Sequence, residues 1–279
     1  MDLLEPFLPA AARYDPAPIV ALHSSGASAK QWQRLRADLG RRAALITPDF
    51  HGHGSGPAWH GAPRDIAEAD VSLALREIDA LGRPVHLVGH SYGGAIALAV
   101  ALRRQRLVRT VTVYEPVAFG LLLGYNPRHA PAAEIVSVGR AIGRRVQRGE
   151  LEDAARVFVT YWSGASAWEA MPPAARLALG GRMPAIRGHF ESLFAATLPV
   201  AALRSLERPV MVVTGERMNA PVRRIVELLG AWLPQVAVAP LRGAGHMGPL
   251  THGEAFAGVL HAFLGTRLTT VAAPLALAA

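Results

Sequence analysis

The chain has 279 residues, no cysteine and a formal net charge of +8, with Lys30 as its one lysine. The lack of cysteine excludes disulfides, a thiol nucleophile and thiolate metal sites, and the length suffices for one large core, alone or with an inserted subdomain. The arginines are scattered singly or in pairs, which indicates a compositional bias rather than a track for phosphates, so we expect no nucleic-acid partner.

Membrane and metal signals are also missing from the sequence. The apolar run from Tyr92 to Leu102 is too short to cross a bilayer, and Asp2 and Glu5 precede any basic residue, unlike a secretory signal. No H-E-x-x-H motif or paired carboxylate–histidine cluster is present. We therefore expect a cytoplasmic protein without a metal, a cofactor or a membrane contact.

Apolar strand-like runs alternate with helical patterns along most of the chain, as in right-handed βαβ units. The predicted strands cover residues 19–23, 44–49, 85–90, 109–114, 209–215 and 236–241. The predicted helices cover about 28–40, 64–81, 92–105, 221–232 and 253–264. The first eighteen residues contain four prolines and offer no good hairpin. The pattern predicts an α/β fold with a mostly parallel central sheet of six to eight strands flanked by helices.

A strand, a sharp turn and a helix meet at Gly89-His90-Ser91-Tyr92-Gly93-Gly94. G-x-S-x-G between a strand and a helix is the nucleophile elbow, in which a strained bend lifts the serine hydroxyl out of the sheet. Gly89 and Gly93 allow neighbouring backbone to pass close to the serine. We therefore predict that Ser91 is a nucleophile.

A serine nucleophile needs a base and an acid that orients the base, and after an elbow these follow in the order acid, then histidine. His246 is the predicted base, because it lies in a glycine-rich loop, residues 243–249, directly after the predicted last strand. His252 and His261 are the competitors, but they fall on or beside the closing helix, and we expect them on its surface.

Several motifs together resemble the α/β-hydrolase superfamily, from about Pro18 to Leu264. Three of them are the elbow, the histidine loop and the strand Val210 to Gly215. A fourth, His23-Ser24-Ser25-Gly26, is similar to the loop that contributes to the oxyanion hole, and a fifth, Asp49 to Gly56, is similar to a D-x-x-G-x-G-x-S segment. The resemblance implies that the backbone N–H groups of Tyr92 and of Ser24 or Ser25 form the oxyanion hole. It also implies that His23, His51, His53 and His90 support loops rather than catalyse.

The acid departs from the commonest pattern of the superfamily. Met218 stands where most relatives have an aspartate, in Gly215-Glu216-Arg217-Met218. A second arrangement, found in some haloalkane dehalogenases, has the acid after the strand that follows the nucleophile helix, and Glu115 lies there, 24 residues after Ser91 and before Pro116. We predict Glu115 as the acid, with Glu216 as the alternative.

Some ninety residues separate the fourth and fifth predicted strands, far more than one crossover requires. Helical periodicity over 131–148, 150–163, 172–181 and 184–196 predicts an inserted helical cap, 118–205, on a core formed by 1–117 and 206–265, with a tail at 266–279. Aromatic residues of this cap, above all Phe158, Trp162 and Phe190, are predicted to bind an apolar part of the substrate.

These features predict a serine hydrolase with a Ser91–Glu115–His246 triad, of carboxylesterase type, that acts on a small, largely apolar molecule through an acyl-enzyme. Ester, thioester, lactone and carbon–carbon hydrolysis all remain open. A ligand-binding receptor on the same fold is the alternative from another functional class. The sequence gives no indication of the oligomeric state.

Overall fold

The computed structural model describes residues 17–40 and 42–265, in which the strands form one six-stranded, all-parallel sheet of order β2-β1-β3-β4-β5-β6. The strands are β1 (Ile19–Leu22), β2 (Leu45–Ile46), β3 (Val85–His90), β4 (Val108–Tyr114), β5 (Val210–Arg217) and β6 (Val236–Gly245). The predicted parallel sheet is therefore confirmed. The expectations for residues 1–16 and for the tail 266–279 lie outside the described residues.

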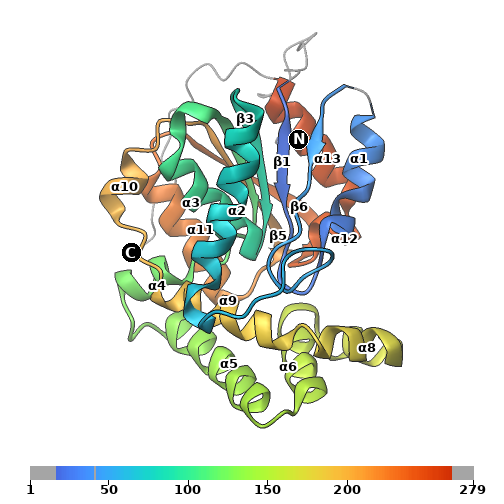
Figure 1. Ribbon diagram of the computed structural model, residues 1–279. Coiled ribbons are helices and arrows are strands. Elements are labelled where there is room, and N and C mark those ends of the chain that lie inside the picture. The colour runs from blue at the N-terminus through green and yellow to red at the C-terminus, as the bar shows by residue number, and fades with distance from the viewer. Residues whose placement is uncertain (1–16, 41, 266–279) are drawn as a thin grey trace.

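Helices cover both faces of the sheet (Figure 1). On one face lie α1 (Gln33–Leu39) and α13 (Gly253–Gly265), and on the other lie α2 (Ile66–Leu81), α3 (Tyr92–Arg103) and α11 (Ala220–Trp232). Strand β1 shows how the sequence produces these layers, because successive side chains of a strand point to opposite faces. Ile19 and Ala21 pack with α1 and α13, whereas Val20 and Leu22 pack with α2 and α3. Both faces are thus buried, which explains the unbroken apolar runs.

The segment between β4 and β5 is helical. Its helices are α4 (Phe119–Tyr125), α5 (Ala130–Gln147), α6 (Leu151–Ser163), α7 (Ala165–Glu169), α8 (Pro173–Gly180), α9 (Met183–Ala195) and α10 (Val200–Arg204). Of these, α5, α6, α8 and α9 lie beyond the carboxyl ends of the strands, whereas α10 returns beside the sheet (Figure 1). The four longest agree closely with the helices predicted here. We did not predict α4, α7, α10 or the four-residue α12 (Gly248–Thr251), because such short helices hardly display a 3.6-residue period.

Two predicted strands, the second and the sixth, differ by several residues from the observed ones, and the others agree to within two residues at each end. β2 has two residues instead of six, because it is an edge strand paired only with β1 and is followed closely by Pro48, which lacks an N–H. β6 is longer than predicted and continues to Gly245, because β5 also extends and Arg217 pairs with Gly245 after a shift of register. Residues 243–245, predicted as loop, are therefore strand, and His246 follows them directly.

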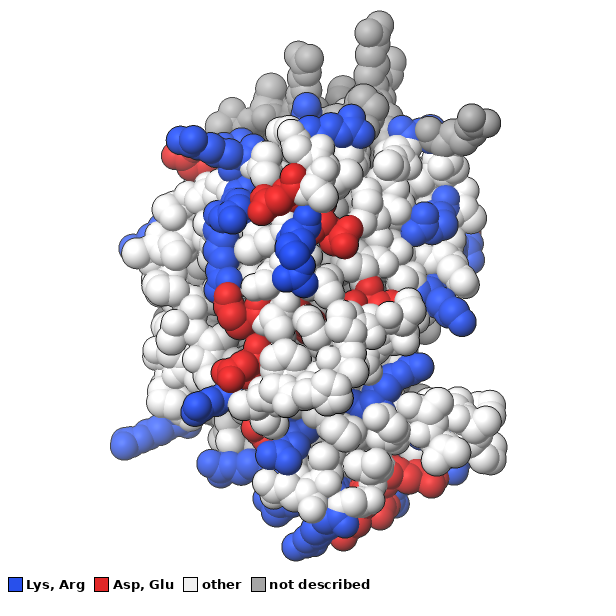
Figure 2. Space-filling model, in the orientation of Figure 1, with Lys and Arg blue, Asp and Glu red and all other residues white. Residues whose placement is uncertain are grey.

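The charged residues do not gather by sign on the face shown in Figure 2. On this face, acidic and basic side chains are interspersed among uncharged ones. Of the helices within residues 17–40 and 42–265, none combines the length and the apolar character needed to cross a membrane. The absence of a nucleic-acid partner stays a prediction.

Candidate active site

Ser91 lies at the tip of the turn between β3 and α3, with φ of 55° and ψ of −115°. This left-handed conformation is uncommon for a residue other than glycine and is typical of a strained functional turn. The two flanking glycines are required for packing. A Cβ on Gly89 would overlap the carbonyl oxygen of Gly93, and one on Gly93 would overlap the carbonyl oxygen of Leu22 in β1. The sequence signature thus has the geometry expected of an elbow.

His246 lies between Ser91 and Glu115 and is hydrogen-bonded to both. Its Nδ1 is 2.7 Å from Oε2 of Glu115, and its Nε2 is 2.9 Å from Oγ of Ser91. A carboxylate accepts only, so Nδ1–H donates to Glu115, which leaves Nε2 to accept the hydroxyl proton of Ser91. The structure therefore brings the three predicted residues within hydrogen-bond distance, and the tautomer that satisfies both contacts is the one that a general base requires.

Glu115 is fully buried at the end of β4 and, like Ser91, has a positive φ, 41°. Its other carboxylate oxygen, Oε1, accepts the backbone N–H of Gly215 at 2.8 Å. Glu216 instead is exposed, and its Oε2 accepts the N–H of Gly243. The structure thus places Glu115, and not Glu216, against His246.

The two competing histidines have other partners. His252 bonds through Nδ1 to the hydroxyl of Thr251 at 2.8 Å, and His261 in α13 pairs with Asp38 of α1 at 3.0 Å. Neither is bonded to Ser91 in the described structure.

The loop after β1 contains Ser24 and Ser25, between which the sequence did not decide. The N–H of Ser24 donates to Oε1 of Gln31 at 3.0 Å, and the hydroxyl of Ser24 donates to the same atom. The N–H of Ser25 has no acceptor among the described residues. Tyr92 is the first residue of α3, so its N–H has no acceptor within the helix. The N–H groups of Ser25 and Tyr92 thus have no acceptor within the part of the chain that the structure describes.

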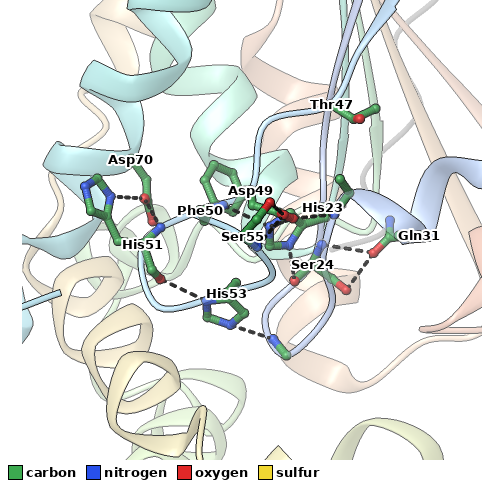
Figure 3. A network of polar contacts seen from close by, with 12 residues as sticks. His23, Ser24, Gln31, Thr47, Asp49, Phe50, His51, His53, Ser55 and Asp70 are labelled. Carbon is green, nitrogen blue, oxygen red and sulfur yellow. Dashed lines mark hydrogen bonds and ion pairs between the residues drawn. The ribbon is translucent and has the colours of Figure 1, made fainter. Parts of the chain in front are cut away.

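Neutral histidines connect this loop to the turn formed by residues 49–55 (Figure 3). Nε2 of His53 accepts the N–H of Gly26 at 3.0 Å, and Nε2 of His23 accepts the N–H of Phe50 at 3.1 Å. Burial, with a contribution from the nearby His53, lowers the pKa of His23 to about 3, and burial lowers the pKa of His53 to about 4. Both imidazoles are therefore uncharged at neutral pH and act as hydrogen-bonding spacers.

The turn formed by residues 49–55 is held in a similar way (Figure 3). Asp49 accepts the N–H of Ala29 through Oδ1 and both the N–H and the hydroxyl of Ser55 through Oδ2. His51 bonds to Asp70 of α2 through its backbone N–H and through Nδ1, at 3.0 and 2.6 Å. His90 bonds through Nε2 to the carbonyl of His246, and burial keeps its pKa well below the usual value. These contacts agree with the loop-supporting roles predicted for the four histidines.

A cavity of about 490 Å³ opens above Ser91 and His246. Its walls are mostly apolar and include Phe158, Trp162, Leu179, Ser25, Met247 and Leu250. The indole of Trp162 stacks on the imidazole of His246, with ring centroids 4.0 Å apart. The structure does not bring Phe190 to this cavity, because its ring packs between Phe119 and Phe194 inside the helical segment.

Two residues of the site were missed by sequence reasoning. Among the described residues that line the cavity, Arg182 is the only one of the types Lys, Arg, Asp and Glu. Its Nη1 donates to the carbonyl of Gly26 at 2.7 Å. His189 of α9 bonds to the hydroxyl of Ser25. Nothing in the sequence distinguishes Arg182 from the many other arginines, and His189 lacks a motif. No group of three or more His, Asp or Glu residues suited to a metal ion occurs within the described part of the chain.

Comparisons with known proteins agree with this fold. The family model for the alpha/beta hydrolase family matches residues 19–259. The chain is 26% identical to the 2-hydroxymuconate semialdehyde hydrolase of Pseudomonas sp. (strain CF600), over 88% of this chain and 86% of that protein. It is 28% identical to the pimeloyl-(acyl-carrier protein) methyl ester esterase of Methylococcus capsulatus, over 89% of this chain and 94% of that protein. The solved enol-lactonase from Burkholderia xenovorans LB400 has the same fold, with a TM-score of 0.71, 20% identity and coverage of 90% and 93%.

Proposed function

The chain belongs to the alpha/beta hydrolase family, and from this premise we propose that it is a serine hydrolase that forms an acyl-enzyme on Ser91. The single observation that carries the proposal is the position of His246, whose two ring nitrogens lie within hydrogen-bond distance of the Ser91 hydroxyl and the Glu115 carboxylate. This is the arrangement in which a serine loses its proton as it attacks.

In the proposed reaction, Oγ of Ser91 attacks an acyl carbon while Nε2 of His246 takes the hydroxyl proton. Glu115 remains ionised and stabilises the imidazolium through Nδ1–H. The negative charge on the former carbonyl oxygen is held by the N–H groups of Tyr92 and Ser25, each worth about 3 kcal/mol in the transition state. His246 then returns the proton to the leaving group, and water releases the acyl group by the same steps in reverse.

We propose that the helices between β4 and β5, within residues 118–205, act as a cap on a core formed by residues 1–117 and 206–265. The cap would select the substrate, because α6 contributes Phe158 and Trp162 to the cavity and α8 contributes Leu179. The apolar walls favour a small, largely apolar acyl or alcohol group. Arg182, at the edge of these walls, favours a carboxylate or another electron-rich group at one end of the substrate.

A carbon–carbon bond hydrolase is the second candidate. It is favoured by the likeness to 2-hydroxymuconate semialdehyde hydrolase over most of the chain, and the same serine, histidine and carboxylate would serve either reaction. The two are distinguished by comparing rates on two kinds of substrate. A carbon–carbon hydrolase should cleave a vinylogous 1,5-diketone acid faster than p-nitrophenyl esters, and an esterase should do the reverse.

Labelling with a fluorophosphonate tests the proposal. The wild-type protein should gain one phosphonyl group on the peptide that contains Ser91 and should hydrolyse short p-nitrophenyl esters. Ser91→Ala should lose both properties, while Ser163→Ala, which removes another hydroxyl of the cavity wall, should still be labelled. A wild-type protein that neither reacts with the label nor cleaves any ester at any pH would be a receptor rather than an enzyme.

A further inference from the structure

His189 of α9 is a fully buried histidine that the proposed chemistry does not use. Its ring lies in a stack of three. One face packs on the ring of Tyr92, with centroids 3.6 Å apart and an interplanar angle of 8°, and the other packs on His53 at 4.9 Å and 16°. Tyr92 and the loop held by His53 supply the two N–H groups of the proposed oxyanion hole. His189 therefore belongs to the cap but contacts the parts of the core that bear the hole.

The ring also makes one short hydrogen bond, between Nδ1 and the hydroxyl of Ser25 at 2.7 Å. Nε2 lies 3.9 Å from Oδ2 of Asp70 and has no hydrogen-bond partner among the described residues. A proton on Nε2 faces this carboxylate favourably, whereas a bare lone pair would not, so Nδ1 is the acceptor and Ser25 donates its O–H. Burial, reinforced by the neighbouring His53 and His23, holds the pKa of His189 well below its usual value, so the ring is neutral.

Ser25, His189 and Asp70 have the residue types of a second serine–histidine–acid set, but their geometry argues against that role. Asp70 already accepts the hydroxyl of Tyr92 at 2.6 Å and both the N–H and the Nδ1 of His51. At 3.9 Å, it does not form a hydrogen bond with His189. An imidazole kept neutral by burial, without an orienting acid, is a poor base. The contact to Ser25 is therefore structural.

We propose that His189 is a positioning residue through which the cap sets the oxyanion hole: it fixes Ser25 by the Nδ1 hydrogen bond and Tyr92 by stacking. The proposal rests on the serine-hydrolase function given above. The N–H of Ser24 is already bonded to Gln31 and that of Gly26 to His53, so the orientation of Ser25 between them decides where its own N–H points. A hole tuned in this way is complete only when α9 is seated on the core.

If His189 has this role, its loss should affect kcat but not KM. The oxyanion hole acts on charge that develops in the transition state, so its misplacement lowers kcat, whereas the apolar walls that hold the substrate are untouched and KM stays near its wild-type value. A displacement of about 1 Å at such a site costs on the order of 100-fold. Loss of the Ser25–His189 hydrogen bond should therefore lower kcat by about 10- to 100-fold.

Four variants test the proposal in steady-state assays with a p-nitrophenyl ester. Ser25→Ala removes the hydroxyl but keeps the N–H, and His189→Phe keeps the ring stack but removes the acceptor. Each should lower kcat by the amount above with KM within about twofold, and the double variant should be no slower than the slower single variant, because both lose the same contact. His189→Asn, whose side-chain oxygen lies near the position of Nδ1, should recover most of the lost kcat.

A matched control exists at the opposite end of β3. Nδ1 of His86 is 2.8 Å from the hydroxyl of Thr110, again a contact between a buried histidine and a half-buried hydroxyl residue, and it lies at the other end of the strand from the elbow. His86→Phe should lower the melting temperature without lowering kcat. If His189→Phe behaves in this way, or if the losses from Ser25→Ala and His189→Phe multiply, the proposal is wrong.

The experiments distinguish a failure of the positioning role of His189 from a failure of the proposed hydrolase function. If the wild-type protein is labelled at Ser91 and turns over esters while Ser25→Ala is as fast as wild type, the positioning role alone is refuted. If the wild-type protein is neither labelled nor active, the function and the positioning role fall together.

Discussion

Replacing Glu115 with glutamine removes a charge while keeping the shape of the side chain. The Glu115 carboxylate accepts two N–H groups, from Gly215 at 2.8 Å and from Nδ1 of His246 at 2.7 Å. A glutamine has one oxygen and one NH₂ group, so one of these two donors must face another donor. If the oxygen stays with Gly215, the NH₂ group forces His246 toward the wrong tautomer, with its proton on the nitrogen that faces Ser91.

The magnitude follows from the charge that is lost. An imidazolium and a carboxylate 4 Å apart attract by about 4 kcal/mol at the effective dielectric constant of about 20 that suits protein sites. The nearest atoms of this pair are 2.7 Å apart and Glu115 is fully buried, so an attraction of about this size applies in the transition state. Since each 1.4 kcal/mol is roughly a factor of ten, Glu115→Gln should lower kcat by about 1,000-fold or more.

Ester hydrolysis measured by stopped flow or long incubation covers this range, with thermal unfolding as a check that the variant is folded. Glu216→Gln is the matched control, because Glu216 is exposed and, within the described residues, its carboxylate bonds only to the N–H of Gly243. It should keep nearly full activity. A folded Glu115→Gln protein with more than about a tenth of the wild-type kcat, or a Glu216→Gln protein with the larger loss, would refute the assignment of the acid.

Three further outcomes are expected. Acid should destabilise the fold, because burial lowers the pKa of His23 to about 3 and of His53 to about 4, so the unfolded chain binds protons that the folded chain does not. The free energy of unfolding, measured in urea, should be full above about pH 6.5 and lower by about 2 kcal/mol per histidine near pH 5, and this loss should be smaller in His53→Gln. Arg182→Gln should raise KM about tenfold for esters that carry a free carboxylate, with neutral esters as the comparison, and equal effects on both would contradict an anion-binding role. Gly93→Ala should lower the stability by about 3 kcal/mol, seen as a reduced melting temperature, because its Cβ would overlap backbone oxygens of Leu22 and His23.

The fold was predictable because its signal is repeated along the chain. Each buried parallel strand is an apolar run, and six such runs alternate with amphipathic helices. The elbow was also predictable, since Gly89 and Gly93 are demanded by backbone contacts within a few residues of Ser91. The choice of Glu115 over Glu216 rested on chain order and on the strand that Pro116 ends, and the structure places Glu115 against His246.

The rest of the site depends on contacts between distant segments, which leave little trace in one sequence. Ser24 and Ser25 are indistinguishable until Gln31 is seen to occupy the N–H of Ser24. Phe190 and Phe158 have the same residue type on neighbouring helices, yet one packs inside the helical segment and the other lines the cavity. Periodicity places a residue on a helix face but does not say what that face meets.

Two positions of unusual backbone connect the proposed acid with the proposed nucleophile. Ser91 and Glu115 are the only non-glycine residues with positive φ within the described residues. They follow adjacent strands whose last residues, His90 and Tyr114, are paired in register. Such conformations cost about 1 to 3 kcal/mol each and persist only when the surroundings impose them.

Here the surroundings are the continuing hydrogen bonds of the sheet. The N–H of Ser91 donates to the carbonyl of Tyr114 at 2.9 Å, and the N–H of Val117 donates back to the carbonyl of Ser91 at 3.2 Å, so these two bonds enclose Glu115. The N–H of Glu115 in turn donates to Val213 of β5 at 3.0 Å. Direct backbone contacts thus hold the proposed acid beside the proposed nucleophile, so the sheet itself fixes the distance between Ser91 and Glu115. His246, which follows the edge strand β6, then lies between Ser91 and Glu115, whose separation is already set by β3 and β4.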